Sequence, residues 1–304
     1  MEANLTERET ALPKRGAVVV GDVFVDCVGH LSTPQVTGLL RDPDADLHAF
    51  APVAMEIGGA GVQFAVAARA AGFEPVTLIG KVGGAGDGRP DEPGERARRF
   101  LMAHGVVPML AVEAGGASGR ALILYTPPDR RIMISDPLAN TTLQASDIGP
   151  EMETAAREAA FVYVSGFVLL QPGRHAAAMC ILAAGRAGGA TTALDLVPHD
   201  IYRYLTYERL RDRLGGIIDW LVVELPAACR LLGHARGDAG TPPAGEVLGA
   251  LACDFPSVAL YVEPGRALVA HRGERSEQRF EYLPGVHSRG QSARAQAELF
   301  AKYR

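Results

Sequence analysis

Short apolar runs rich in β-branched residues alternate along the chain with Ala-rich stretches in which apolar residues recur at helical spacing. This alternation is typical of βαβ units, in which helices cover both faces of a parallel sheet. The pattern predicts strands over residues 17–28, 75–83, 161–167, 191–197, 218–224, 258–263 and 267–273, and helices over 62–72, 94–105, 175–188, 227–233 and from about 246. We therefore expect a polar N-terminal tail, residues 1–16, and a single doubly wound α/β domain, residues 17–304.

Two stretches break this rhythm. Residues of about 30–57 and 117–137 contain short strand-like pieces bounded by Pro, Gly and Asp. Such pieces suit antiparallel strands better than the long apolar strands of a buried parallel sheet. We expect them to form a small β lid that stands off the main sheet.

Charge and cysteine content narrow the choice of partner. The 304 residues include 30 Lys and Arg against 35 Asp and Glu, a formal charge of -5, which indicates neither nucleic acid nor a membrane surface as partner. The N-terminus lacks the basic start and apolar core of a signal peptide, so we expect a cytoplasmic protein. The four cysteines are far apart and form no CxxC pair, which indicates neither zinc nor a disulfide framework. A small molecule is the expected partner.

Five segments together resemble the PfkB, or ribokinase, family of carbohydrate kinases. They are GDVFVD at 21–26, GGAGVQFAVAARAAG at 58–72, GKVGGAGDG at 80–88, LANTTL at 138–143 and LDLVP at 194–198, and the similarity extends from residue 17 to about 290. The resemblance implies a ribokinase-like fold with a β lid. It also implies transfer of the γ-phosphoryl group of ATP, bridged by Mg²⁺, to a hydroxymethyl group of a sugar or nucleoside.

The resemblance assigns an acceptor site to one set of residues, and each has a structural alternative. The Asp26 carboxylate can accept hydrogen bonds from two hydroxyl groups, but it can also cap a loop amide. Glycines can let the backbone approach a ligand, but they also serve in tight turns. Asn140 can face substrate or cap a helix, and Asp195 at a strand end is open to the same two interpretations. The substrate-binding residues implied by the resemblance are Asp26, Gly58, Gly59, Gly61, Gln63 and Asn140.

The phosphate end of the family pattern is altered. The family's NxxE motif, which organises magnesium, aligns with Glu224 and Ala227, so only the first position keeps an oxygen ligand. The family's GAGD segment binds the developing negative charge with helix-start amides, and its Asp is the general base. Here that segment keeps Gly290 but has Ala293 at the base position, and His287 is the alternative base. The nucleotide loop keeps one glycine, Gly265.

A second GAGD, at residues 84–87, is not expected to replace the lost one. The turn-forming residues GRPDEPGE come next, so Asp91 and Glu92 should lie near the start of the following helix and repel phosphate.

Three readings remain open. The chain is a kinase with an unrecognised base such as His287, or a non-catalytic pseudokinase that binds a sugar or nucleoside, or a frame-shifted version of a normal kinase from about residue 286. The chain ends eleven residues after Ala293, whereas family members continue through further helices. We therefore expect apolar sheet surface to be uncovered unless a partner shields it, and we expect a homodimer through the exposed lid strands.

Overall fold

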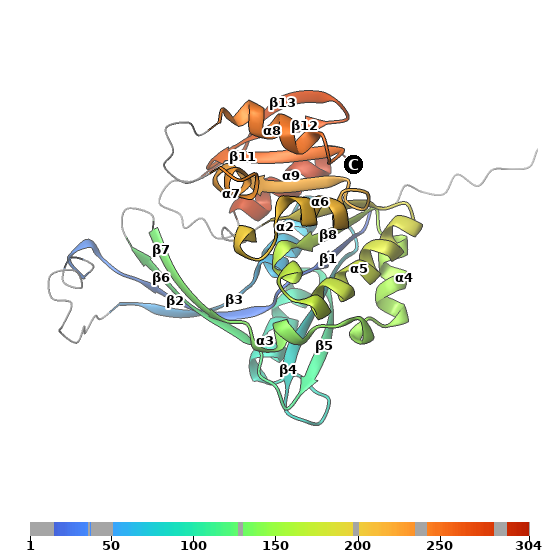
Figure 1. Ribbon diagram of the computed structural model, residues 1–304. Helices are drawn as coiled ribbons and strands as arrows, with labels where there is room; N and C mark the ends of the chain where they lie inside the picture. Colours follow the sequence, from blue (N-terminus) through green and yellow to red (C-terminus); the bar gives the residue numbers. More distant parts are fainter. Residues whose placement is uncertain are drawn as a thin grey trace, which may run out of the picture.

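The computed structural model describes residues 15–35, 37, 51–126, 130–196, 201–234, 242–282 and 291–303. These parts of the chain form two sheets (Figure 1). The large sheet has the order β13-β12-β11-β10-β9-β8-β1-β4-β5, with β12 antiparallel to both of its neighbours and the other pairs parallel. Its strands are β1 (Ala17–Val20), β4 (Val76–Gly84), β5 (Val106–Ala114), β8 (Phe161–Ser165), β9 (Thr191–Asp195), β10 (Trp220–Glu224), β11 (Ser257–Glu263), β12 (Arg266–His271) and β13 (Glu274–Arg279).

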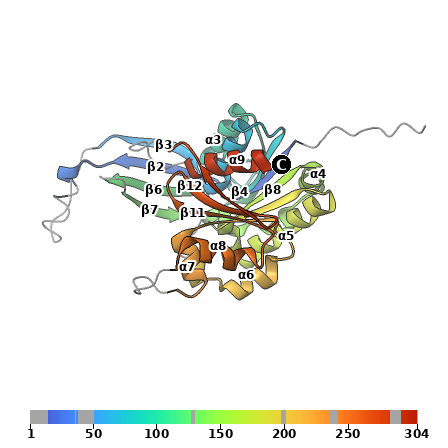
Figure 2. The same ribbon diagram turned by 90° about the horizontal axis from the view of Figure 1, so that it is seen from above.

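Helices cover both faces of this sheet (Figure 2). Alternate residues of one strand enter different cores: Val18 and Val20 of β1 belong to one apolar cluster, and Val19 belongs to the other. One face is covered by α2 (Ala60–Ala70), α3 (Glu92–Ala103) and α9 (Gln291–Tyr303). The opposite face is covered by α4 (Pro150–Glu158), α5 (Pro172–Ala187), α6 (Tyr207–Leu214), α7 (Leu225–Leu231) and α8 (Ala244–Ala252). The predicted doubly wound α/β class is confirmed.

The lid is a separate four-stranded sheet of order β3-β2-β6-β7. Its strands are β2 (Phe24–His30), β3 (Val53–Gly58), β6 (Gly119–Thr126) and β7 (Arg130–Asp136). All four strands meet the main body at the same end of the lid, where Phe24 pairs with both Gly58 and Gly119. The expected segment 117–137 agrees with β6 and β7, but the lid takes in more of the N-terminal part than the expected 30–57.

The predicted strand over residues 17–28 is wrong as a single element. The chain leaves the large sheet after Val20, passes through Gly21 to Val23, and enters the lid as β2. The continuous apolar run over residues 17–28 indicates buried strand residues, but it does not show that the first and second halves of the run belong to different sheets. Asp26, which lies within the predicted strand 17–28, therefore belongs to a lid strand and not to the large sheet.

The expected uncovered apolar surface over the large sheet is also wrong for the described residues. Trp220 and Val269, on the face that α9 covers, are buried beside Phe300 of that helix. In the described ranges, the exposed large apolar side chains are Val53, Met55, Met102, Val107, Leu122, Ile132, Met133, Ile134 and Tyr204, and six of these nine lie in the lid. In the same ranges, no helix has the length and apolar character needed to cross a bilayer.

Candidate functional site

The candidate site lies where the lid meets the carboxyl ends of the parallel strands. Open α/β sheets bind ligands beyond this edge of the sheet. Asp26 of β2 is opposite Glu56 of β3 and Ala121 of β6, and it is 4 % exposed. A buried carboxylate on a lid strand is the group that the resemblance assigns to sugar hydroxyls.

Close packing between α2 and the end of β1 accounts for two of the predicted glycines. Gly59 precedes α2 with a φ of 102°, and a Cβ there would lie 2.2 Å from the carbonyl oxygen of Asp22. A Cβ on Gly61 would lie 2.8 Å from the Cα of Gly21. These glycines are required by contact with the chain's own backbone, whatever the site binds. Gly58 ends β3 opposite Phe24 in the lid ladder.

Asn140 is not a helix cap, and its side chain is bonded to the backbone of Val23. Its Oδ1 accepts a hydrogen bond of 2.9 Å from the Val23 amide, and its Nδ2 donates one of 2.8 Å to the Val23 carbonyl. Asn140 is 2 % exposed, inside the 3₁₀ helix η1 (Leu138–Thr142) and not at its N-cap. The side chain therefore fastens η1 to the link between β1 and β2, and both of its polar atoms are engaged.

Gln63 lies in the first turn of α2 and is half-buried. Its Nε2 is 3.5 Å from the carbonyl oxygen of Ile57 in β3, a long contact. No side chain caps α2. The Gln63 side chain therefore reaches back towards the lid base.

A buried ion pair at this edge was not predicted from the sequence. Asp22 follows β1 and pairs with Arg174 in the first turn of α5, and the two side chains are 5 % and 4 % exposed. Burial raises the pKa of Asp22, and the adjacent Arg174 charge opposes this effect. Arg174 also donates to Gln171 at 3.2 Å, while its buried Nε has no partner. The only sequence signal was the acid within GDVFVD, because nothing local connects it to a residue 152 positions away.

Asp195 holds α9 against the sheet. Its Oδ2 accepts hydrogen bonds from the Tyr163 hydroxyl at 2.7 Å and from Nε2 of Gln296 at 2.9 Å. All three residues are buried. The strand-end carboxylate therefore fixes α9 rather than standing open to a ligand.

The residues of the phosphate end lie on separate elements. Glu224 ends β10 with an exposed side chain, and Ala227 is buried in α7. Ala293 lies in the first turn of α9, half-buried against the apolar cluster that includes α2. Gly265 has a φ of 75° in the turn between β11 and β12, where a Cβ would lie 2.9 Å from the Phe280 carbonyl oxygen, so its role is explained by the turn. His287 and Gly290 lie outside the described residues.

The second GAGD behaves as predicted. Gly84 ends β4, and the following residues form an exposed loop in which Asp87 accepts hydrogen bonds from Arg89. The helix starts only at Glu92, with Asp91 as its N-cap through a 2.9 Å bond from the Gly94 amide. A carboxylate already occupies this helix start, as the sequence indicated.

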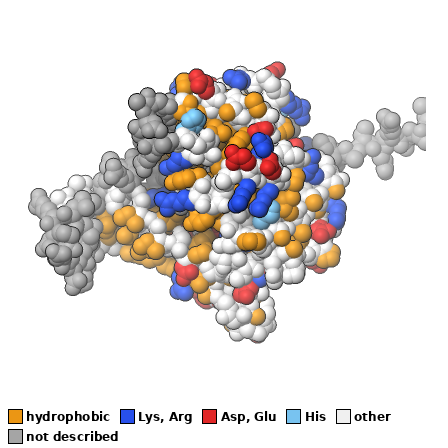
Figure 3. Space-filling model, viewed as in Figure 1, with side chains coloured by type: hydrophobic (Ala, Val, Ile, Leu, Met, Phe, Trp, Pro, Cys, Tyr) orange, Lys and Arg blue, Asp and Glu red, His pale blue; other side chains and the backbone are white. Residues whose placement is uncertain are grey.

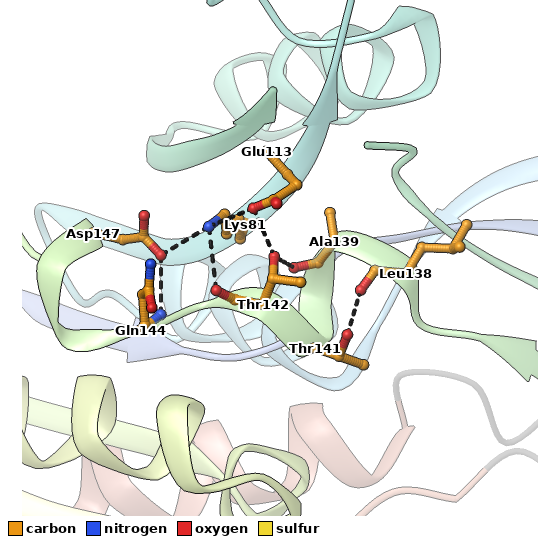
Figure 4. Close-up of polar contacts among 8 residues, drawn as sticks. All are labelled: Lys81, Glu113, Leu138, Ala139, Thr141, Thr142, Gln144 and Asp147. Carbon is orange, nitrogen blue, oxygen red and sulfur yellow. Dashed lines mark hydrogen bonds and ion pairs between the residues drawn. The ribbon is translucent and has the colours of Figure 1, made fainter. Parts of the chain in front are cut away.

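A second buried charge cluster joins β4, β5 and the segment after the lid (Figure 4). Lys81 is 4 % exposed, and its Nζ lies 2.7 Å from Glu113, 3.0 Å from Asp147 and 3.2 Å from the Thr142 carbonyl. Burial alone would lower the pKa of Lys81, but the hydrogen bonds and charges of the two carboxylates together raise it. The ammonium group is fully coordinated by the protein, so we assign the cluster a structural role.

The overall arrangement matches solved kinases. An adenosine kinase from Sinorhizobium meliloti superposes with a TM-score of 0.76 over 95 % of this chain and 88 % of its own length. The chain has the ribokinase, or PfkB, fold. A ribokinase from Giardia lamblia (TM-score 0.73, 95 % and 82 % covered) and an ATP-bound fructokinase from Xylella fastidiosa (0.67, 96 % and 84 %) share it. Sequence identities are 19, 14 and 15 % respectively, and the sequence matches no protein-family model and no curated protein.

The ribokinase fold confirms the architecture that the five motifs implied, including the lid. Three of these motifs, GDVFVD, GGAGVQFAVAARAAG and LANTTL, contact one another at the lid base, where the link after β1 packs against α2 and η1. The fold itself does not assign a reaction, because one fold supports many chemistries through different sites.

Proposed function

We propose that this protein binds a sugar or nucleoside at the Asp26 side of the lid and does not transfer a phosphoryl group by the family's GAGD mechanism. The observation that carries the proposal is the side chain in the first turn of α9. A methyl group, that of Ala293, stands where the resemblance places the general base. An alanine cannot accept the proton of an attacking hydroxyl.

The acceptor side keeps its chemistry. Asp26 is a buried carboxylate next to the lid base, and ionised carboxylates form strong hydrogen bonds to hydroxyl groups. A site that retains this group and loses the base is suited to binding without turnover.

The described residues do not fit the magnesium site that the resemblance implies. Of the two positions that should organise the metal, Glu224 carries a carboxylate and Ala227 carries a buried methyl group. Mg²⁺ prefers oxygen ligands. Within the described ranges, no cluster of three His, Cys, Asp or Glu side chains could hold a metal ion. These features support weak or absent binding of ATP with Mg²⁺.

Isothermal titration calorimetry with ribose, fructose, adenosine and ATP–Mg²⁺ tests the proposal. We expect one of the sugars or the nucleoside to bind, and ATP–Mg²⁺ to give no heat. Asp26→Asn should weaken binding at least about tenfold, since hydrogen bonds to a charged group contribute about 1.5–3 kcal/mol. Asp136→Asn is the matched control, because Asp136 is an exposed lid carboxylate on the opposite face of the sheet. Equal effects of the two substitutions would contradict the assignment.

An active ATP-dependent kinase is the second candidate. The exposed carboxylate of Glu224 at the start of α7 favours it, because that group remains accessible at the phosphate end. Phosphorus NMR of the protein with ATP–Mg²⁺ and the bound acceptor measures turnover directly. Turnover that His287→Ala abolishes would establish this candidate and overturn the first.

We also propose that two copies associate through one face of the lid. Met55, Leu122 and Ile134 are in cross-strand register and are 49, 38 and 63 % exposed. Val53 and Ile132 extend the same face, and Figure 3 shows hydrophobic side chains gathered over the lid strands. Exposed apolar patches of this kind mark association surfaces.

Light scattering tests the association. We expect a dimer that Ile134→Asp converts to a monomer. Met133→Asp is the matched control, because Met133 is 49 % exposed but points to the opposite face of the same strand. A monomeric wild-type protein would refute this proposal without affecting the sugar-binding one.

A further inference from the structure

A cavity of about 360 Å³ lies at the edge of the large sheet remote from the lid. It is formed by the amino-terminal ends of β9, β10 and β11, together with the ends of α5, β12 and α9. In Figure 1 the cavity lies on the side of the large sheet where the C-terminus is marked, and the lid strands extend from the opposite side. Small-molecule pockets have volumes of about 300–1,000 Å³, so this one can hold a small metabolite.

The charged groups that line the cavity are mainly basic. Arg186, His271 and Arg272 contribute nitrogen groups, and Asp219 contributes the one carboxylate of the lining. Asp219 is already engaged: its Oδ2 accepts from the Thr192 amide at 2.8 Å and hydroxyl at 2.9 Å, and its Oδ1 lies 3.5 Å from Arg186. The charges of Asp219 and Arg186 offset each other, so Arg272 gives the lining a net positive charge, which favours an anionic ligand.

Arg272 is the residue that most needs an explanation. Its guanidinium forms no hydrogen bond or ion pair within the described part of the chain, although it lines the cavity. Its backbone has a φ of 49°, and the following Gly273 has a φ of 87°. These two residues form the tight turn between β12 and β13, a conformation that favours Asn, Asp or Gly at the first position. Arg272 is thus an exposed arginine that lines the cavity and is held in a disfavoured backbone conformation, and such strain is concentrated at functional sites.

Aromatic groups form a rigid wall beside this arginine. The His271 ring stacks on Trp220, with centroids 5.0 Å apart and an interplanar angle of 14°, and it also contacts Tyr303. The Nδ1 atom of His271 lies 2.8 Å from the Ser257 hydroxyl. The imidazole is therefore fixed in orientation before any ligand arrives, which lowers the entropy cost of binding.

We propose that this cavity is a second ligand site, which binds a small metabolite through a phosphate or carboxylate group held by Arg272. Guanidinium groups recognise both of these oxyanions through paired hydrogen bonds. The site is separate from the lid, and it does not depend on the function proposed for the lid.

Trp220 provides a direct readout, because it lines the cavity and is the single tryptophan of the sequence. Titration with inorganic phosphate, fructose 6-phosphate and citrate should change its fluorescence in a saturable way. A response to the phosphate compounds identifies a phosphorylated ligand, and a response to citrate identifies a carboxylate; either supports the proposal. If none of the three compounds gives a saturable response at concentrations up to about 10 mM, the proposal is wrong.

Arg272→Asn separates binding from folding. Asparagine suits the turn, so the ligand-free variant should melt at the same temperature as wild type or higher, while its affinity for the oxyanion falls at least about tenfold. Arg272→Gly should behave in the same way. Arg275→Asn is the control, since Arg275 is an exposed arginine three residues further along that does not line the cavity. Unchanged affinity in both Arg272 variants overturns the proposal.

Discussion

Replacement of Asn140 by alanine tests the fastening between the lid base and the main body. The change removes both hydrogen bonds to Val23, a residue that is itself 1 % exposed. A buried polar group left without a partner costs about 1–3 kcal/mol, so the two backbone groups together should cost about 2–6 kcal/mol. Because domains of this kind are stable by only about 5–15 kcal/mol, the loss should be large and easily measured.

Urea unfolding followed by circular dichroism gives the free energy of unfolding of wild type and variant. Thr141→Ala is the control: the neighbouring side chain is half-buried and bonds only to the local Leu138 carbonyl, so we expect a loss below about 1 kcal/mol. Asn140→Asp adds a further check. Its ionised carboxylate would face the Val23 carbonyl, so this variant should recover stability relative to wild type as the pH falls and protonation restores a donor. A loss in Asn140→Ala no greater than in the control would refute the reasoning.

Three further outcomes follow from the structure. Gly59→Ala should cost about 3 kcal/mol or more because its Cβ meets a carbonyl oxygen at 2.2 Å, whereas Gly86→Ala, with a φ of 92° and open space, should cost only about 1–2 kcal/mol in chemical unfolding. Burial lowers the pKa of His175 and His271, and a nearby arginine adds to the effect in each case. Below about pH 6.5 the unfolded chain therefore binds more protons at these positions than the folded chain does, so the free energy of unfolding should decrease as the pH falls. Denaturation at pH 7.5 and 5.5 should show a smaller decrease when both are changed to Gln; an equal decrease would exclude them as the cause. Lys81→Met leaves two carboxylates unpaired and should cost about 3 kcal/mol in the same assay, and a loss under about 1 kcal/mol would show that the cluster is not stabilising.

The layered fold was predictable because buried parallel strands are apolar on both faces. Each predicted core strand after residue 28 overlaps an observed one, and the Ala-rich helices lie between them. Two edge strands were missed for physical reasons. Pro108 interrupts the apolar run of β5, and a proline is tolerated in a strand at the sheet edge. The β13 strand is polar and almost entirely exposed, so it lacks the apolar pattern of a central strand.

The site was predictable only in part. Local motifs located the lid base, and the Asp91 cap showed why the second GAGD is not a phosphate site. Pairs that depend on the tertiary fold had no local signature: Asp22 meets Arg174, and Lys81 meets Asp147, across 152 and 66 residues. The turn that holds Arg272 was likewise hidden, since its first residue is not one that normally marks such a turn.

The way in which the lid is attached has a mechanical consequence. All four lid strands join the main body at one end, and Asn140 locks that end to Val23, whereas the ends at His30, Val53 and Thr126 project away from it (Figure 1). Because the lid sheet is attached at one end only, any bending of the sheet displaces its far end most and its attached end least. A ligand bound near Asp26 would lie close to the attached end of the lid, where motion of the far end disturbs its contacts least. Amide exchange should accordingly slow, residue by residue, from the tip of each lid strand to its root.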